Sequence, residues 1–332
     1  MSRRPTLRDV ADLAGVSIKT ISRVVNGSGP VAPTTEARVR AAIAELGFRP
    51  NPAARSLRVG VDDAVGLVVE NLADPFMATL TASVEARMRE AGIFVIVTSG
   101  GYEPQNERKA VENLAYRRVA GIILTPTSPS HRYLADGAVG LPLVFVDRPP
   151  VQYDADTVLA DNEGGAKIAT EHLLAHGHRS IAFVGDRIGL FTTSLRHQGF
   201  RGAMASAGVE VHDHLVRTDV VDTASTARAV REMLAHDHRP TAIIAANARS
   251  SLGMIRGLHE GQPVRVAHVS FDDFDVAPSL SPPVTVVTQD PVHMGRAAAD
   301  LLLDRLENPD RPTKHLMLPT RLIVRGSGEM RP

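Results

Sequence analysis

Basic and hydroxyl side chains are interleaved near the start of the chain, in the segment SIKTISRVVN at residues 17–26. Lys19 and Arg23 are four residues apart, a spacing that puts both side chains on one side of a helix. Such cations reach the acceptor atoms that base pairs expose in the major groove of DNA, and an apolar Ile18 beside them can pack on thymine methyl groups. Three further polar side chains of the segment suit contacts with phosphates, which fix register without reading sequence: Thr20, Ser22 and Asn26. The types and spacing of these side chains therefore predict recognition of double-stranded DNA.

Two helices joined by a tight turn are needed to position this segment. Thr6 predicts a helix start, because its hydroxyl can cap exposed N–H groups while Asp9 lies near the positive helix end. The small side chain of Ala11 lets two helices cross closely, Gly15 can take the positive φ of a sharp turn, and Ile21 fills the space between the helices. This spacing predicts a helix-turn-helix, whose second helix enters the major groove. Any other helical hairpin is the alternative.

A third helix is predicted from Thr34 or Thr35 to Leu46, and a short segment, NPAARSLR at residues 51–58, follows it. An N-cap residue and a proline at the first helical position open the short segment, but it is too short for a stable isolated helix. We expect a hinge helix that becomes ordered on DNA. Its leucine would enter the minor groove and its arginines would face phosphates. An ordinary interdomain linker is the alternative.

Charge is distributed unevenly along the chain, although the net charge is zero. Residues 1–60 hold ten Lys or Arg and four Asp or Glu, whereas the remainder holds 27 and 33. A basic N-terminal part on an acidic remainder indicates that only the N-terminal part meets a polyanion. A solvated basic surface is the alternative that charge alone leaves open.

From residue 64 onward, short apolar runs alternate with amphipathic stretches. The runs AVGLVV, IFVIVTS, AGIILTP and LPLVFVD predict buried strands, with helices such as residues 75–91 and 104–117 between them. A second series begins near Val158 with TVLAD, SIAFVGD, TAIIAAN and VRVAHVSFDD. This alternation is typical of doubly wound parallel sheets with helices on both faces, so we predict two α/β lobes. Ligands of such sheets bind beyond the carboxyl ends of the strands, where two facing lobes form a cleft.

Polar side chains recur at these strand ends and are candidates for binding a ligand in the cleft. Carboxylates and amides suit the hydroxyl groups of a polyhydroxylated ligand, and an aromatic ring can stack on an apolar sugar face. The candidates are Asn71, Asp74, Phe76, Asp147, Arg148, Asp161, Thr192, Arg196, Asn247, Asp272 (or its neighbour Asp273) and Gln289. Each residue alone is more often a helix cap or an ordinary loop residue, so the hypothesis rests on the set.

The N-terminal order LRDVADLAGVSIKTISRVVNG, then RVRAAIAELGFRPNPAARSLRVG, resembles the DNA-binding part of the LacI/GalR family of bacterial transcriptional regulators. The resemblance places the family's recognition positions on Ile18, Lys19 and Arg23, and its minor-groove leucine on Leu57. The expected DNA contacts are Thr6, Leu7, Ser17, Ile18, Lys19, Thr20, Ser22, Arg23 and Asn26, followed by Arg55, Leu57 and Arg58 in the hinge helix.

The remainder of the chain resembles the same family's core, which is related to periplasmic sugar-binding proteins. The segments that carry the resemblance are DNEGGAKIATEHLLAHGHRSIAFVGD, RHQGFRGAM and LPTRLIVRGS. The resemblance singles out Arg196, Asn247 and Asp272 as effector contacts and places residues 291–306 on the first lobe, with HLMLPTRLIVRGS as a strand that crosses toward the second. The chain departs from the family at Ala248, where many members have Asp.

The resemblance implies a homodimeric repressor that binds an approximately palindromic operator and is controlled by a small-molecule effector. Each half of a palindrome takes one helix-turn-helix, so a two-fold dimer is expected. The expected domains are a helix-turn-helix at residues 1–50, a hinge helix at 51–60 and an effector-binding, dimerising part at 61–332. Within that part, the first lobe takes about 61–160 plus 291–318, and the second about 161–290 plus 319–332.

Several other classes of function are disfavoured. The absence of cysteine excludes disulfides, thiolate metal sites and thiol nucleophiles. No nucleotide-binding, zinc-protease or hydrolase motif is present, so we expect no catalytic residues, no metal and no cofactor. We expect no signal peptide and no membrane span, and hence a cytoplasmic protein. A solute-binding protein of a transport system, or an enzyme acting on sugars or nucleosides on the same fold, are the rival interpretations.

Overall fold

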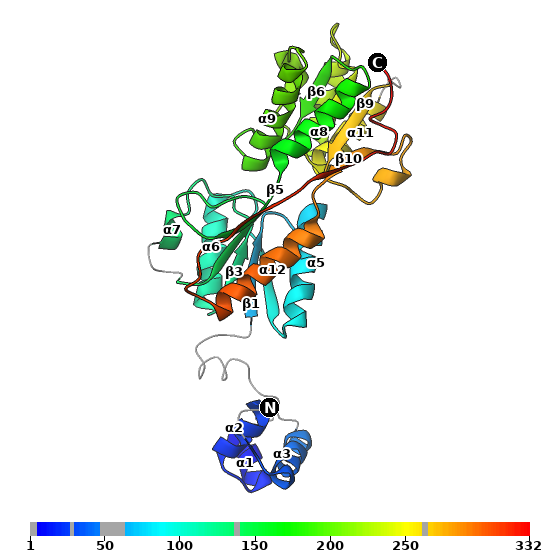
Figure 1. The fold of residues 1–332 in the computed structure, drawn as a ribbon. Helices are drawn as coiled ribbons and strands as arrows, with labels where there is room; N and C mark the ends of the chain where they lie inside the picture. Colours follow the sequence, from blue (N-terminus) through cyan, green and yellow to red (C-terminus); the bar gives the residue numbers. More distant parts are fainter. Residues whose placement is uncertain (1–4, 27–29, 47–63, 136–139, 261–264) are drawn as a thin grey trace. The chain divides into compact units, whose positions relative to one another are not determined.

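The structure is a computed structural model of the chain, and it describes residues 5–26, 30–46, 64–135, 140–260 and 265–332. The chain divides into two compact units, Met1–Asp63 and Ala64–Pro332, which we term the head and the core. Figure 1 shows that the head is helical and that the core consists of two α/β lobes. The expected hinge helix at residues 51–60, with Arg55, Leu57 and Arg58, lies outside the described residues.

The head contains the helices α1 (Leu7–Ala14), α2 (Ile18–Asn26) and α3 (Pro33–Leu46). Thr6 and Asp9 form a capping box at the start of α1: the Asp9 N–H donates to Thr6 Oγ1 at 3.3 Å, and the Thr6 N–H donates to Asp9 Oδ2 at 2.6 Å. Gly15 ends α1 with a φ of 63°, which suits glycine. The predicted start of α1 and the turn after it are confirmed. The third helix begins at Pro33, slightly earlier than predicted, because proline fits the first turn of a helix.

Small and β-branched side chains form the hydrophobic core of the head. Ile21 is fully buried between the helices, as its spacing from Ala11 and Gly15 predicted. The buried residues are Val10, Ala11, Ala14, Ile21, Val39 and Ala42. The apolar face of α2 is used in this packing, so its polar face is left for solvent or a partner.

The first lobe of the core is built on a parallel sheet in the order β11-β5-β4-β3-β1-β2. Its strands are β1 (Ala64–Val69), β2 (Phe94–Ser99), β3 (Ile122–Leu124), β4 (Leu143–Val146), β5 (Asp156–Ala160) and β11 (His315–Leu318). Its helices are α5 (Pro75–Glu90), α6 (Pro104–Tyr116), α7 (Arg132–Ala135) and α12 (Pro291–Glu307). Helices α5 and α12 pack together on one face of the sheet, and α6 covers the other face (Figure 1).

The second lobe repeats this architecture with the strand order β12-β10-β9-β8-β6-β7. Its strands are β6 (Ile181–Val184), β7 (Val216–Arg217), β8 (Ala242–Ala245), β9 (Ala267–Phe271), β10 (Thr285–Thr288) and β12 (Arg321–Ile323), the last antiparallel to β10. Its helices are α8 (Asn162–Ala175), α9 (Phe191–Ser206), α10 (Thr223–Leu234) and α11 (Ala248–His259), with short 3₁₀ turns at Asp213–Leu215 and Ala277–Ser279. The pair α8 and α9 packs on one face and α10 and α11 on the other. The predicted fold class is confirmed.

Two sequence predictions about strands need correction. The run TVLAD, which the pattern grouped with the second series, forms β5 and pairs with β4 and β11 in the first sheet. The segment HLMLPTRLIVRGS, expected as one crossing strand, forms β11 in the first sheet and β12 in the second. Pro319 lies between the two strands and lacks the N–H that would continue the ladder.

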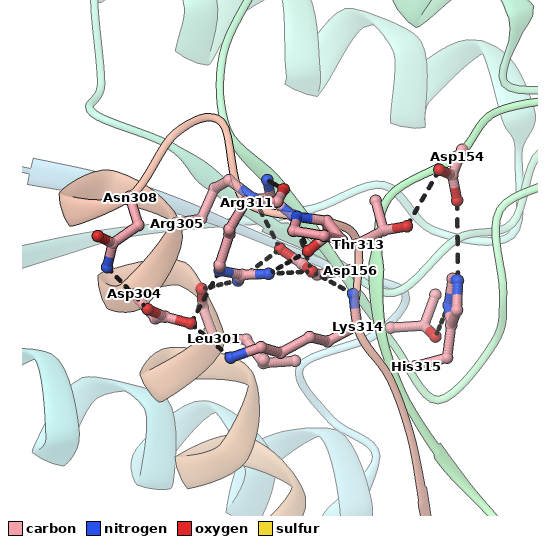
Figure 2. A network of polar contacts seen from close by, with 12 residues as sticks. Asp154, Asp156, Leu301, Asp304, Arg305, Asn308, Arg311, Thr313, Lys314 and His315 are labelled. Carbon is pink, nitrogen blue, oxygen red and sulfur yellow. Dashed lines mark hydrogen bonds and ion pairs between the residues drawn. The ribbon is translucent and has the colours of Figure 1, made fainter.

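The chain passes between the lobes in three places, after β5, after β10 and after β11. The segment that leads into β11, ahead of the third passage, is fixed to the first lobe by Asp156, at the start of β5, whose side chain is completely buried. It accepts hydrogen bonds from Arg305 at 3.0 and 3.1 Å, from Arg311 at 2.8 and 2.9 Å, and from the Lys314 N–H at 2.8 Å (Figure 2). Burial alone would raise the pKa of Asp156, but these partners hold it below its usual value. The network joins the end of α12 and the start of β11 to the sheet.

Candidate functional site

The polar face of α2 is the candidate DNA-reading surface. Ile18 is 41% exposed, and Lys19 and Arg23 are also exposed, whereas Ile21 on the opposite side is fully buried. The Ser17 hydroxyl accepts from the Thr20 N–H at 3.2 Å at the start of the helix. The packing of α2 therefore leaves both cations and the isoleucine exposed.

Other predicted DNA contacts have local roles in the head. The Thr6 hydroxyl belongs to the capping box, and Leu7 is half-buried against the hydrophobic core. Ser22 is half-buried. The side chain of Asn26 is outside the described part of the structure, as are the three hinge residues. The DNA contacts of all these residues remain predictions.

The core contains a cleft that both lobes line. Nine of the eleven sequence candidates lie in it: Asp74, Phe76, Asp147, Arg148, Thr192, Arg196, Asn247, Asp272 and Gln289. They come from loops and helix starts at the carboxyl ends of the strands, where doubly wound sheets bind ligands. The cleft contains about 450 Å³ of empty space, open solvent at its mouth included.

The first lobe contributes a buried chain of charged groups. Arg148 donates from Nη2 to Glu70 Oε2 at 2.6 Å and from Nη1 to the carbonyl oxygen of Pro126 at 3.1 Å. Its Nε lies 3.4 Å from Asp147 Oδ2. Asp74 caps α5, with Oδ1 accepting from the Phe76 N–H at 2.9 Å. These contacts fix the guanidinium group of Arg148 and leave most of the Asp147 carboxylate without a hydrogen-bond partner.

Arg196 is the centre of the second lobe's wall. It is 4% exposed and donates to Asn162 Oδ1 at 2.7 Å and to the carbonyl oxygen of Ala246 at 2.5 Å. Its guanidinium carbon lies 3.8 Å from the centre of the Phe271 ring, and its Nη1 lies 3.6 Å from Asp272 Oδ2. Gln289 Nε2 donates to Asp272 Oδ1 at 2.8 Å. Arg196 and Asp272 are therefore held in place before any ligand binds.

A third cluster joins the lobes at the cleft. Asn247 caps α11 and donates from Nδ2 to Asp186 Oδ2 at 3.1 Å. Arg249 forms an ion pair with the same Asp186 carboxylate and donates a hydrogen bond to the hydroxyl of Tyr102, which belongs to the first lobe. The pKa of Arg249 is raised, because Asp186 and Tyr102 outweigh the opposing effect of burial.

Burial sets the protonation equilibria of the cleft. It raises the pKa of Asp272 to about 6, and the nearby carboxylates of Asp74 and Asp147 add to the increase, while Arg196 and Gln289 oppose it. Burial also raises the pKa values of Asp147 and Glu70 despite the presence of Arg148. Perturbed carboxyl groups that converge in a cleft are typical of a binding site.

Backbone strain occurs at equivalent positions of the two lobes. Asp147 follows β4 with a φ of 71°, and Asp272 follows β9 with a φ of 66°. Strands β4 and β9 occupy the same place in the strand order of their sheets. A non-glycine residue with positive φ costs roughly 1–3 kcal/mol and clusters at ligand sites, where the surrounding structure maintains it. Both residues line the cleft.

Two candidates do not line the cleft. Asn71 Oδ1 accepts from the Ala73 N–H at 3.0 Å, and Asp161 caps α8 by accepting from the Gly164 N–H at 2.9 Å. The cleft lining also includes seven residues that the sequence reasoning did not select: Glu70, Met77, Tyr102, Asp186, Leu190, Thr193 and Arg249. Glu70 and Asp186 directly follow or nearly follow strands, so the same rule could have found them. No comparable signal marks Tyr102 or Arg249.

The described part of the chain contains no group of three or more His, Asp or Glu arranged to hold a metal ion. No helix in that part is long and apolar enough to cross a membrane. The cleft offers fixed hydrogen-bonding groups and an apolar surface at Phe76, which is chemistry for binding a small polar molecule.

Two family models match the chain, one to each unit. Residues 6–51 match the bacterial regulatory proteins of the lacI family, and residues 62–325 match the periplasmic binding proteins and sugar-binding domain of the LacI family. Together the two matches cover the candidate DNA-reading surface and the cleft.

Relatives match over nearly the whole chain. The ribose operon repressor of Escherichia coli (strain K12) is 30% identical over 97% of this chain and 99% of its own length. The transcriptional regulator CelR of Thermobifida fusca is 37% identical over 98% of this chain and 99% of its own.

Solved structures are similar over the same extent. A complex of CelR with cellobiose has a TM-score of 0.72 at 34% identity, over 98% of this chain and all of that one. The lac repressor dimer bound to operator and an anti-inducer has a TM-score of 0.87 at 27% identity, over 98% of this chain and 99% of that one. These relatives are DNA-binding regulators, so the rival interpretations as a transport protein or an enzyme are not favoured. The chain belongs to the LacI family of bacterial transcriptional regulators.

Proposed function

We propose that this regulator is a dimeric repressor that reads an approximately palindromic operator with α2 and responds to a sugar or related metabolite in the cleft of its core. The observation that carries the proposal is the convergence of Arg196, Asp272 and Gln289 with Asp147 and Arg148. These side chains come from both lobes and meet in one cleft. A ligand that binds all of them contacts both lobes at once and therefore stabilises one lobe–lobe arrangement over others.

The relatives support the class of ligand and the assembly. The ribose operon repressor carries the name of a sugar, and CelR has been solved with cellobiose. The lac repressor occurs on its operator as a dimer. By analogy, we propose that two copies of this chain bind the two halves of an operator, in the cytoplasm where the chromosome lies.

The proposed mechanism is a population shift. Effector in the cleft changes the angle between the lobes, the first lobes of the dimer move relative to each other, and the hinge segment at residues 51–60 gains or loses order on DNA. Leu57 is the residue proposed to enter the minor groove. An inducer favours release from DNA and a corepressor favours binding. In both cases the effector changes the affinity for DNA, and DNA changes the affinity for the effector by the same factor.

Footprinting with the full chain tests the proposal. DNA from upstream of the chain's own coding region and its neighbours is digested with and without protein, and random-sequence DNA serves as competitor. We expect an approximately palindromic protected site whose occupancy changes when ribose, cellobiose or another sugar of a screening panel is added. Failure to prefer any such site over random DNA would contradict the role as an operator-binding regulator. A protected site that no metabolite affects would contradict only the effector part.

A further inference from the structure

The cleft lining contains more negative than positive groups. Five carboxylates line it, from Glu70, Asp74, Asp147, Asp186 and Asp272. Three guanidinium groups oppose them, from Arg148, Arg196 and Arg249. The excess of carboxylates gives the cleft a negative potential when all of them are ionised, and low-dielectric walls strengthen that potential.

The three guanidinium groups already have carboxylate partners. Arg148 Nη2 lies 2.6 Å from Glu70 Oε2, Arg249 pairs with Asp186, and Arg196 Nη1 lies 3.6 Å from Asp272 Oδ2. A ligand anion that recruits one of these arginines must compete with a buried carboxylate for it. The displaced carboxylate would be left buried and unpaired, which is strongly unfavourable.

Two carboxylates have no arginine of their own. Asp147 shares Arg148 with Glu70, and its Oδ2 lies 3.4 Å from Arg148 Nε. The Asp74 carboxylate accepts a hydrogen bond from the Phe76 N–H at the start of α5. The carboxylates also act on one another: Asp74 raises the pKa values of Asp147 and Asp272, and Asp147 and Asp186 raise that of Glu70, in each case adding to the larger effect of burial. An incoming phosphate or carboxylate would meet the same repulsion.

The unused hydrogen-bonding atoms of the cleft suit hydroxyl groups. Glu70 Oε1 and Gln289 Oε1 are buried acceptors without a hydrogen-bond partner, and Arg249 Nε is a buried donor without one. A hydroxyl group both donates and accepts, so it can satisfy either kind of atom. A phosphate dianion or carboxylate group only accepts, so that group itself cannot satisfy the unpaired acceptors.

We propose that this cleft selects uncharged, polyhydroxylated ligands and rejects their phosphorylated and carboxylated counterparts. The inference rests on the proposed function, because it assumes that the effector binds in the cleft. It is narrower than that function, because it states that uncharged sugars bind in the cleft and that charged sugars do not. A place where an anion could bind nevertheless exists: the first turn of α9, next to Thr192 and Thr193, has no side-chain cap. The experiment must therefore include small anions.

The first arm of the experiment uses inorganic phosphate and sulfate and needs no knowledge of the effector. Thermal unfolding of the full chain is followed at constant ionic strength, with chloride as the reference anion. Phosphate and sulfate stabilise folded proteins in general because they are excluded from the protein surface, so we expect any stabilisation relative to chloride to be the same in the wild type and in the variants Arg249→Gln and Arg148→Gln. A stabilisation that disappears in Arg249→Gln or Arg148→Gln would place an anion in the cleft and overturn the inference.

The second arm uses matched sugars. Calorimetric titrations compare ribose with ribose 5-phosphate, glucose with glucose 6-phosphate and glucuronate, and cellobiose with cellobionate. We expect any sugar that binds to be the uncharged member, with its charged counterpart weaker by at least about tenfold, because like charges at a binding surface are strongly disfavoured. An anionic member that binds as tightly as its uncharged counterpart, with binding lost in Arg196→Ala, overturns the inference.

A charge variant provides the control. Asp147→Asn should narrow the affinity ratio between the uncharged and charged members of a binding pair, because it removes one uncompensated carboxylate. Asp310→Asn makes the same change in net charge at an exposed position outside the cleft and should leave the ratio unchanged. If no sugar binds and phosphate has the same effect on the wild type and the arginine variants, the rejection of anions stands and the sugar part of the proposed function fails. Footprinting reports operator binding separately.

Discussion

Tyr102 of the first lobe and Arg249 of the second meet across the cleft. The guanidinium group donates a hydrogen bond to the phenol oxygen, and its carbon lies 5.4 Å from the centre of the ring. Arg249 is anchored to its own lobe by Asp186. The contact therefore links helix α11 of one lobe to the loop between β2 and α6 of the other, and a change in the angle between the lobes must alter it.

Tyr102→Phe removes the hydroxyl and keeps the ring. A hydrogen bond to a charged group contributes about 1.5–3 kcal/mol, and the partial exposure of Tyr102 lowers this to about 0.7–1.5 kcal/mol, so effector affinity should change by about three- to tenfold. Titration calorimetry with a binding sugar measures the change. Tyr116→Phe is the matched control, because Tyr116 is 89% exposed and does not line the cleft. Equal effects of the two variants would contradict a role for the contact.

Lys19→Ala and Arg23→Ala test base recognition by α2. Each variant should relax preference at a defined operator position, at about 1–3 kcal/mol for a bidentate contact. Binding to a library of single-base operator variants measures this. Arg40→Ala is the control, because Arg40 is exposed on α3 and pairs with Glu36 at the surface. A uniform loss of affinity across all sequences would instead identify Lys19 and Arg23 as phosphate contacts.

Asp272→Asn tests the electrostatics of the cleft through pH. Burial raises the folded-state pKa of Asp272 to about 6 from an ordinary value of 3.8, so the folded state binds the proton more tightly than the unfolded state. Ionised Asp272 therefore destabilises the core above pH 6, and the penalty diminishes as the pH falls through 6 toward 3.8. The full penalty that ionised Asp272 imposes on the free energy of unfolding is on the order of 2–3 kcal/mol.

The expected result is a pH-dependent difference between the two proteins. Relative to Asp272→Asn, the wild type should be less stable at pH 7.5 and should gain stability as the pH is lowered to 5. The free energy of unfolding from urea titrations at both values measures the difference. A difference that does not vary with pH would show that the carboxyl group of Asp272 is not perturbed.

Asp156→Asn tests the anchor of β11 that Figure 2 shows. The substitution leaves Arg305 and Arg311 facing a neutral side chain, and breaking a buried charge pair costs about 3–5 kcal/mol. We expect a correspondingly large fall in the thermal unfolding midpoint. Asp154→Asn is the control: Asp154 contacts His315 and Thr313 nearby, but its side chain is 75% exposed, so the effect should be below about 1 kcal/mol. Comparable losses in the two variants would contradict the anchoring role.

Local chemistry made much of the fold predictable from the sequence. The hydroxyl of Thr6 and the carboxylate of Asp9 cap α1, and Gly15 supplies the positive φ after it, because these effects depend on neighbouring residues alone. The rule that ligands bind at the carboxyl ends of parallel strands was sufficient to find Arg196 and Asp272. The same rule selected Asn71 and Asp161, whose side chains bond to adjacent backbone, because a polar residue after a strand can serve either purpose.

Long-range relationships were beyond the sequence pattern. Tyr102 and Arg249 come from opposite lobes, and no periodicity connects them. The pattern of apolar runs grouped the strand TVLAD with the second series, because an apolar run carries no information about which strand it pairs with. The lobe bounds that the resemblance implied, about 61–160 for the first lobe, agree with its place in the first sheet. Its place in the first sheet depends on β4 and β11, and β11 begins after residue 314, far along the chain.

Operator binding as a function of effector concentration tests most directly whether one chain couples DNA reading to ligand sensing. Fluorescence anisotropy of a labelled operator fragment is measured with the wild type and with Arg196→Ala, alongside titration calorimetry of the ligand. A saturating effector should change the operator affinity of the wild type at least about fivefold. Arg196→Ala should bind operator as the ligand-free wild type does and show no response. An operator affinity that stays constant while calorimetry shows the cleft filled would contradict the coupling.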